Sequence, residues 1–185
     1  MERLTADFFE RSPLVCAREL IGAKFLWHGC EGRIVETEAY AAEGDEACHT
    51  FFRPGARAFV ASHPAGTAYV YLNYGVHWLF NVLVHGPHGA GFVLFRALEP
   101  LAGIERMMER RGKSKVRELC SGPGKLTRAL GIDGSVHGCD FLGGESTGIV
   151  TGASRAVTSS FRIGISRAQD LPWRFHEDEN VHVSR

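Results

Sequence analysis

Two glutamates stand two residues apart in a mostly apolar stretch of this chain, at Glu36 and Glu38. Residues alternate around them as in a β-strand, so both carboxylates and Tyr40 should share one face. Two carboxylates on one face repel each other unless one is paired or solvated. One hypothesis is that one of the two glutamates has a functional role rather than a structural one. The alternative is that both lie at a sheet rim and bind Arg33, Arg96 or backbone amides.

Basic residues gather in one part of a chain that is neutral overall. The 21 Lys and Arg residues balance 21 Asp and Glu residues, which argues against a general attraction to nucleic acid. Between residues 106 and 128, however, eight basic side chains stand against two acidic ones. This segment is either a DNA-binding surface or a solvated helix face and loop. A helix expected from Ser121 to Gly131 would place free amides and Lys125 at one terminus, which suits a phosphate.

The composition is that of an ordinary globular protein. With 185 residues, 44% of them hydrophobic and 23% charged, one domain is expected over residues 1–185. The five cysteines are scattered, without a Cys-x-x-Cys pair, so we expect a reducing compartment and no zinc site. The N-terminal residues lack the apolar stretch of a signal peptide, and no apolar run is long enough to span a membrane. We therefore expect a protein that is neither secreted nor membrane-spanning.

Local signals predict two further helices. Ser12 can cap a helix that starts at Pro13 and stops at Gly22. Another helix should start at Pro100 and end at Gly112. The second helix presents four apolar residues at helical spacing, and its methionines are interpreted as core residues: Leu101, Ile104, Met107 and Met108.

Short extended segments predict a mainly antiparallel sheet and hence an α+β fold. Residues 68–84 are aromatic and β-branched around Asn73 and Gly75, which favours a hairpin with Tyr74 at its tip. Residues 41–67 lack clean periodicity and are interpreted as a long loop in a binding surface. The remaining strands are expected at residues 23–27, 33–40 and 92–97, near Phe141, and at residues 160–165.

Longer blocks of the sequence resemble the 3-methyladenine (alkyladenine) DNA glycosylase family. They lie in the family's order and cover most of the chain. The resemblance implies a single compact α+β domain with a curved, mainly antiparallel sheet flanked by helices, and a protruding β-hairpin that inserts into DNA. The blocks are residues 32–40 (GRIVETEAY), 45–49 (DEACH), 69–75 (YVYLNYG), Asn81, 93–100 (VLFRALEP) and 118–126 (ELCSGPGKL).

The resemblance assigns the group that activates water. Glu38 matches the family's catalytic carboxylate, and Glu36 would be its structural neighbour. Arg96 matches an arginine that helps to hold the water and a nearby phosphate. The backbone carbonyl of Ile163 matches a third contact to the water. A buried ion pair between Arg96 and either glutamate is compatible with that role.

Four residues match the pocket that receives the extruded base. Tyr40, His49 and Tyr71 match residues that sandwich the base between aromatic faces, and such stacking is stronger when an alkylated base is positively charged. Asn81 matches an amide that meets the purine edge and crowds out the exocyclic amino group of guanine. The resemblance therefore implies selection by shape and charge.

Five residues match contacts to the DNA outside the pocket. Tyr74 matches a side chain that enters the minor groove and fills the gap left by the flipped nucleotide, with Gly75, Val76 and His77 beside it. Lys125 matches a contact to the DNA backbone. Val76 and His77 replace bulkier groove-inserting residues of some relatives, so the grip on the duplex is left open.

The resemblance thus implies a monofunctional DNA glycosylase of base excision repair, which hydrolyses the N-glycosidic bond of alkylated or deaminated purines and leaves an abasic site. A lyase would need an amine nucleophile for a Schiff base, and no matching position places a lysine beside Glu38. The expected partner is double-stranded DNA containing damaged purines, bound by a monomer without metal or cofactor, in the cytoplasm, with the nucleoid in a bacterium, or in the nucleus. Two alternatives stay open: a non-catalytic module for damaged DNA or RNA, and a hydrolase of free nucleosides. The lesion range is open too, because residues 51–64 depart from the relatives.

Overall fold

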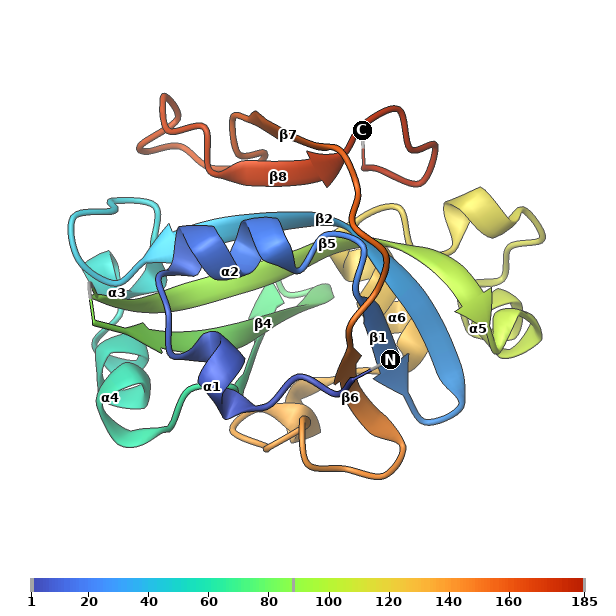
Figure 1. Cartoon of the computed structure of the whole chain (residues 1–185), viewed down its shortest axis with the longest axis horizontal. Helices are drawn as coiled ribbons and strands as arrows, with labels where there is room; N and C mark the ends of the chain where they lie inside the picture. Colours follow the sequence, from blue (N-terminus) through green and yellow to red (C-terminus); the bar gives the residue numbers. More distant parts are fainter. Residues whose placement is uncertain (1, 88, 185) are drawn as a thin grey trace.

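A curled sheet of eight strands forms the centre of the computed structural model, which describes residues 2–87 and 89–184 (Figure 1). Neighbouring strands pair antiparallel throughout. Six strands follow the order β3-β4-β5-β2-β1-β6, and β8 pairs with both β2 and β7. The strands are β1 (Lys24–Trp27), β2 (Cys30–Ala41), β3 (Ala68–Asn73), β4 (His77–Gly86), β5 (Gly89–Ala102), β6 (Thr147–Val150), β7 (Val157–Ser160) and β8 (Arg174–Glu177).

Helices cover the sheet on both sides. In Figure 1, α1 and α2 lie in front of the sheet, α6 lies behind it, and α3 and α4 lie at one end. The helix α6 packs against β4, β5 and α5. The helices are α1 (Ala6–Phe9), α2 (Pro13–Glu19), α3 (His49–Phe52), α4 (Pro54–Ser62), α5 (Ile104–Arg111) and α6 (Pro123–Leu130), with single 3₁₀ turns η1 (Val116–Glu118) and η2 (Gly134–Val136).

The core lies between these layers and is built around clustered aromatic rings. Phe25 is fully buried and contacts Phe80 and Phe95 with ring centroids 5.4 and 5.3 Å apart. Phe80 in turn meets Phe141 edge to face. Such offset and edge-to-face pairs are the favourable arrangements of aromatic rings. Because β2 and β5 lie at the middle of the sheet with layers on both sides, their side chains are buried on both faces.

The α+β fold and the antiparallel sheet are confirmed, as are several element boundaries. The Ser12 hydroxyl accepts a hydrogen bond from the Val15 amide at 3.3 Å and caps α2, which begins at Pro13. The predicted hairpin forms from β3 and β4. The helix α5 ends at the predicted Gly112 and buries Met107.

Four expectations about elements are wrong. Residues 41–67 are not one long loop, because they contain α3 and α4, which are too short to show a clear helical period. Pro100 does not start a helix but lies in β5 opposite Gly32, next to a bulge where its missing amide is tolerated. Residues 160–165 are not a strand, since β7 ends at Ser160, and the strand expected near Phe141 lies later, in β6.

Within the described part of the chain, every helix is too short or too polar to cross a membrane.

Candidate active site

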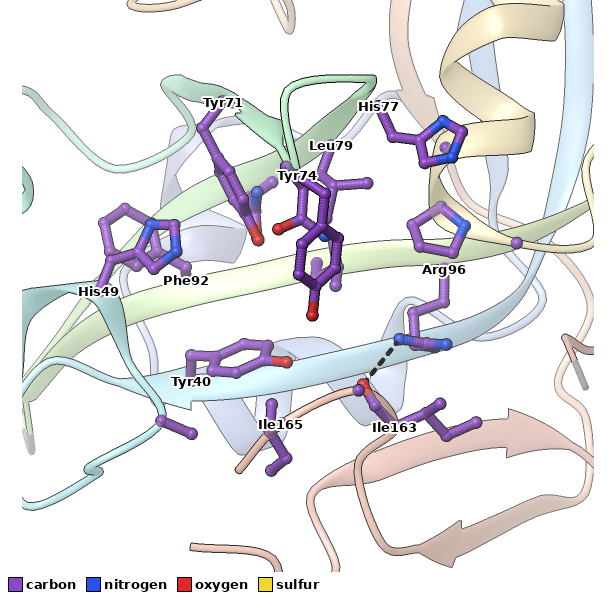
Figure 2. Close-up of a pocket in the computed structure, with 18 of the residues that line it drawn as sticks. Tyr40, His49, Tyr71, Tyr74, His77, Leu79, Phe92, Arg96, Ile163 and Ile165 are labelled. Atoms are coloured by element: carbon purple, nitrogen blue, oxygen red, sulfur yellow. Dashed lines mark hydrogen bonds between the residues drawn. The ribbon is translucent and has the colours of Figure 1, made fainter. Parts of the chain in front are cut away.

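A cavity of about 910 Å³ opens on the side of the sheet where β2, the β3-β4 hairpin, β5, α3 and the start of α6 meet (Figure 2). A cavity of this size lies at the upper end of the range typical of ligand pockets. Its lining includes nine residues singled out in the sequence: Tyr40, His49, Tyr71, Tyr74, His77, Asn81, Arg96, Lys125 and Ile163. Segments from distant parts of the chain thus converge on one site.

The two glutamates of β2 are both fully buried, so they are not at a sheet rim. Their carboxylates share one guanidinium, as expected for a common face. Arg96 Nε donates to Glu36 at 3.0 Å, and Arg96 Nη1 lies 3.2 Å from Glu38 Oε1. Repulsion between the carboxylates is therefore offset by a buried cation. The expected buried ion pair between Arg96 and one of the glutamates is confirmed, and the arginine in fact pairs with both.

Glu36 is held by groups from three parts of the chain. Besides Arg96, it accepts hydrogen bonds from Arg174 Nε at 2.6 Å and from both the amide and the hydroxyl of Ser184 at 2.7 and 2.8 Å. Burial acts to raise the pKa of Glu36, but the guanidinium groups of Arg96 and Arg174 outweigh it, and the pKa lies below its ordinary value. Its full set of donors marks Glu36 as a fixed anion that orients Arg96.

Glu38 has a different set of partners. The Tyr40 hydroxyl donates to Glu38 Oε2 at 2.7 Å, and the Ile163 amide donates to Oε1 at 2.8 Å. The carbonyl of the same Ile163 lies 3.5 Å from Arg96 Nη1, drawn as the dashed line in Figure 2. Burial and the charge of Glu38 raise the pKa of Tyr40 well above its ordinary value, so the phenol stays protonated and donates. The carboxylate itself lies directly behind the wall formed by Tyr40, Arg96 and Ile163.

Aromatic side chains form the walls of the cavity in front of this cluster. His49 and Tyr71 are in contact, with ring centroids 4.3 Å apart, and Tyr40 lies across the cavity from Tyr71 in Figure 2. The Asn81 amide donates to the Tyr69 carbonyl at 3.1 Å. This bond fixes the side-chain orientation of Asn81 and leaves its own carbonyl oxygen for another donor. The walls therefore offer flat faces with one oriented amide.

His49 is held neutral at ordinary pH. Burial, with the nearby charge of Arg53, lowers the pKa of His49 from 6.5 to about 4. Its Nδ1 atom lies 3.0 Å from the Tyr69 hydroxyl. A neutral imidazole allows a cationic ring to bind against this wall without charge repulsion.

Protonation of His49 should destabilise the fold in mildly acidic solution. The folded-state pKa of about 4 lies below the ordinary value of 6.5, so the unfolded chain binds the extra proton first. The free energy of unfolding should therefore be fully retained above pH 6.5 and fall as the pH decreases toward 4. The variant His49→Gln should show a smaller fall when denaturant unfolding is compared at pH 7 and pH 5. Equal falls in both proteins would contradict this assignment.

The tip of the β3-β4 hairpin presents an exposed aromatic side chain. Tyr74 is 83% exposed and adopts a left-handed backbone conformation at φ 50°. Gly75 follows at φ 70°, and Val76 is also exposed. His77 packs against Gly124 so closely that a Cβ at residue 124 would lie 2.9 Å from its ring. The hairpin is therefore braced against α6 while its tip stays in solvent.

Comparison with known proteins agrees with this geometry. Residues 7–181 match the sequence profile of the methylpurine-DNA glycosylase family. The chain belongs to this family. It is 43% identical over 194 residues to a candidate 3-methyladenine DNA glycosylase of Chlorobaculum parvum, covering 100% of this chain and 91% of that protein. It is 44% identical to counterparts in Chlorobaculum tepidum and Agrobacterium fabrum, covering 100% and 97% of this chain and 92% and 91% of those proteins.

Membership of the methylpurine-DNA glycosylase family makes the chain a hydrolase of N-glycosidic bonds in DNA, with a role in the repair of alkylated purines. The family resemblance read from the sequence blocks is thereby confirmed. Family membership alone does not assign a role to any individual residue.

The basic segment of this glycosylase is used in part for its own fold. Arg110 donates to the carbonyls of Ala129 and Leu130 at the end of α6, and Arg111 donates to the carbonyl of Leu119. Such bonds satisfy carbonyls that a helix or turn leaves unpaired. Lys125 instead lies exposed at the start of α6, where its ammonium contacts the carbonyl of Ser121 at 3.1 Å. Part of the segment therefore has a structural role, and its use as a DNA-binding surface stays a prediction.

Sequence reasoning missed a buried ion pair between Asp45 and Arg162. Arg162 donates to both carboxylate oxygens of Asp45 at 2.6 and 2.8 Å, and both side chains are fully buried. The guanidinium also lies 4.6 Å from the centre of the Tyr40 ring and donates to the Ala39 carbonyl. Since Ile163 follows Arg162 directly, the pair links β2 to the segment that contacts Glu38. No local sequence pattern links Asp45 and Arg162, which lie 117 positions apart in the chain.

Proposed function

We propose that this methylpurine-DNA glycosylase flips an alkylated or deaminated purine out of duplex DNA into the aromatic cavity. There it hydrolyses the N-glycosidic bond with a water activated by Glu38, and it leaves an abasic site. The observation that carries the proposal is that Glu38 contacts Arg96 and Ile163, which line the aromatic cavity, and lies directly behind them. A general base must lie within hydrogen-bond reach of its proton donor.

Glu38 and two groups beside it can hold one water molecule in place. Arg96 and the Ile163 carbonyl offer a donor and an acceptor beside Glu38 Oε1. Glu38 Oε2 is occupied by the Tyr40 hydroxyl. A carboxylate oxygen can accept more than one hydrogen bond, so Glu38 can still accept a proton from the water while Tyr40 stays bound. The bond from Tyr40 holds the carboxylate in a fixed orientation beside the aromatic wall.

The cavity walls suit a flat and electron-poor ring. Stacking between Tyr40 on one side and Tyr71 with His49 on the other supplies aromatic faces, which attract a cationic alkylpurine more strongly than a neutral base. The lowered pKa of His49 keeps the imidazole itself uncharged. Asn81 meets the purine edge with the carbonyl oxygen that its bond to Tyr69 leaves available. A steric clash between Asn81 and the exocyclic amino group of guanine would exclude guanine from the cavity.

The hairpin tip would fill the gap that the flipped base leaves. Tyr74 is exposed, rigidly placed by the braced hairpin, and lies at the mouth of the cavity. Gly75, Val76 and His77 would contact the minor groove beside it. Lys125 with the amides at the start of α6 would hold a phosphate of the backbone.

Hydrolysis without strand cleavage is expected. A β-lyase needs an amine in the pocket that can form a Schiff base with the sugar. Among the described residues that line the cavity, Lys125 is the one lysine. Its ammonium is hydrogen-bonded to the Ser121 carbonyl. Within the same part of the chain, no three His, Cys, Asp or Glu side chains gather as metal ligands would. A water held by Glu38 would serve without a metal.

Base release from defined duplexes tests the proposal. We expect the protein to release free base from duplexes carrying 3-methyladenine, ethenoadenine or hypoxanthine, in the presence of a chelator, and to leave intact strands with abasic sites. A free deoxynucleoside should be a far poorer substrate, because the groove contacts act only on DNA. Lesion-dependent binding without release from any duplex would point to a recognition module, and equal turnover of free nucleoside would point to a nucleoside hydrolase.

A further inference from the structure

Two phenylalanines remain exposed at the rim of the cavity, on the short helix α3. Phe51 is 49% exposed and Phe52 is 53% exposed, and both line the cavity. The helix α3 starts with His49, so one turn of chain carries both a pocket wall and this rim. The Phe52 ring meets the His49 ring edge to face at 5.5 Å. The exposed aromatics are thus a direct continuation of the base pocket.

Arginine side chains accompany these rings. The Arg53 guanidinium lies 5.6 Å from the centre of the Phe52 ring and 5.7 Å from that of Tyr71. The Arg167 guanidinium lies 5.6 Å from the centre of the Phe51 ring. Among the described carboxylates, Glu46 pairs with Arg167 at 3.4 Å, and the side chain of Glu46 is itself exposed. Aromatic faces mixed with an excess of cations are the features by which proteins bind unstacked nucleotides.

The position of the α3 rim beside the cavity indicates which part of a DNA substrate could bind to it. Figure 2 places His49 at one side of the cavity and His77, beside α6, at the other. A DNA strand whose nucleotide enters the cavity must pass over the mouth, between the hairpin with Lys125 and the α3 rim. Tyr74 would fill the gap inside the duplex, so it is a neighbouring nucleotide drawn toward the α3 rim together with the flipped one whose base face needs a new partner.

We propose that Phe51 and Phe52, with Arg53 over Phe52, form a stacking platform for the nucleotide next to the flipped one in the same strand. The proposal rests on the proposed function for its DNA substrate, and it adds a second aromatic contact on the side of the cavity away from Tyr74. Phe52 stacks the base face, and Arg53 contacts the adjoining phosphate. The chemistry recognised is an unstacked nucleotide within duplex DNA, of any base.

Binding to a duplex with a tetrahydrofuran abasic analogue tests the platform without requiring catalysis. Because one aromatic–base stack contributes strongly to binding, Phe52→Ala should weaken the Kd on the order of tenfold. Phe52→Tyr should restore the wild-type Kd, whereas Phe52→Leu should not. Phe161→Ala is the matched control, since Phe161 is 62% exposed but does not line the cavity. Arg53→Gln should reduce the salt dependence of binding by about one phosphate contact.

The single-turnover rate of base release at saturating enzyme separates the platform from a structural role. The Phe52→Ala variant should keep this rate within about twofold, because stacking on a neighbour acts on binding. An unchanged Kd, or a lowered saturating rate at unchanged Kd, would overturn the platform. A dimer that sediments without DNA and dissociates in Phe52→Ala would also overturn it. Failure of the wild-type protein to release base would instead refute the proposed function, and the Kd comparison would still decide the platform.

Discussion

Glu38→Gln should lower the rate of base release by roughly 10² to 10⁴-fold, the usual contribution of a general base, while lesion binding stays intact. Glutamine fills the same space and can still accept the hydrogen bond from the Ile163 amide. Arg96 keeps its bond to Glu36, so the buried cation is not left without a partner. What is lost is the ability to take a proton from water.

The measurement is single-turnover release of ethenoadenine from a duplex, with the Kd of the same duplex measured in parallel. Glu43→Gln is a suitable control, because Glu43 lies just after β2, the strand that carries Glu38, but its side chain is exposed. The control should release base at the wild-type rate. If Glu38→Gln released base as fast as the control, the water would have to be activated by another group, and the assignment of Glu38 would be wrong.

Asp45→Asn should lower the free energy of unfolding by about 3–5 kcal/mol, the range for breaking a buried ion pair on one side. The substitution leaves the guanidinium of Arg162 buried and without its counter-charge. Burial alone acts to lower the pKa of Arg162, and it is the bonds to Asp45 that raise it above its ordinary value. The loss should also loosen Tyr40 and Ile163, which Arg162 contacts or adjoins.

Denaturant unfolding measures this effect, and the neighbouring residue supplies a control. Glu46 also pairs with an arginine, Arg167, but both side chains of that pair are more than half exposed. Exposed ion pairs contribute about 0–1 kcal/mol, so Glu46→Gln should change stability by less than about 1 kcal/mol. Similar changes in the two variants would show that Asp45 and Arg162 are not a structural pair.

Much of the site could be predicted because its residues lie in continuous sequence blocks. The strand with Glu36 and Glu38 and the hairpin with Tyr74 at its tip were each visible as a local pattern. Helix α6 was also visible, because Pro123 and Gly131 mark its two ends. Local patterns of this kind depend on neighbours within a few residues, which sequence periodicity can report.

Other parts could not be predicted, for identifiable physical reasons. The helix α3 has four residues, fewer than a helical period needs to become visible. Pro100 resembled a helix start because only the pairing partner at Gly32 reveals the bulge that accommodates it. The contacts of Asp45 with Arg162 and of Glu36 with Ser184 join residues more than 100 positions apart. Such contacts depend on the tertiary fold alone.

The donors around Glu36 have a consequence for the order in which the molecule assembles. Arg96 is 60 positions away along the chain, whereas Arg174 and Ser184 are 138 and 148 positions away. Contacts this distant close large loops and form slowly. Until Arg174 and Ser184 arrive, the buried glutamates are only partly satisfied, which is unfavourable in a low-dielectric interior. Catalytic competence should therefore be the last property that a refolding chain acquires, after the sheet has already formed.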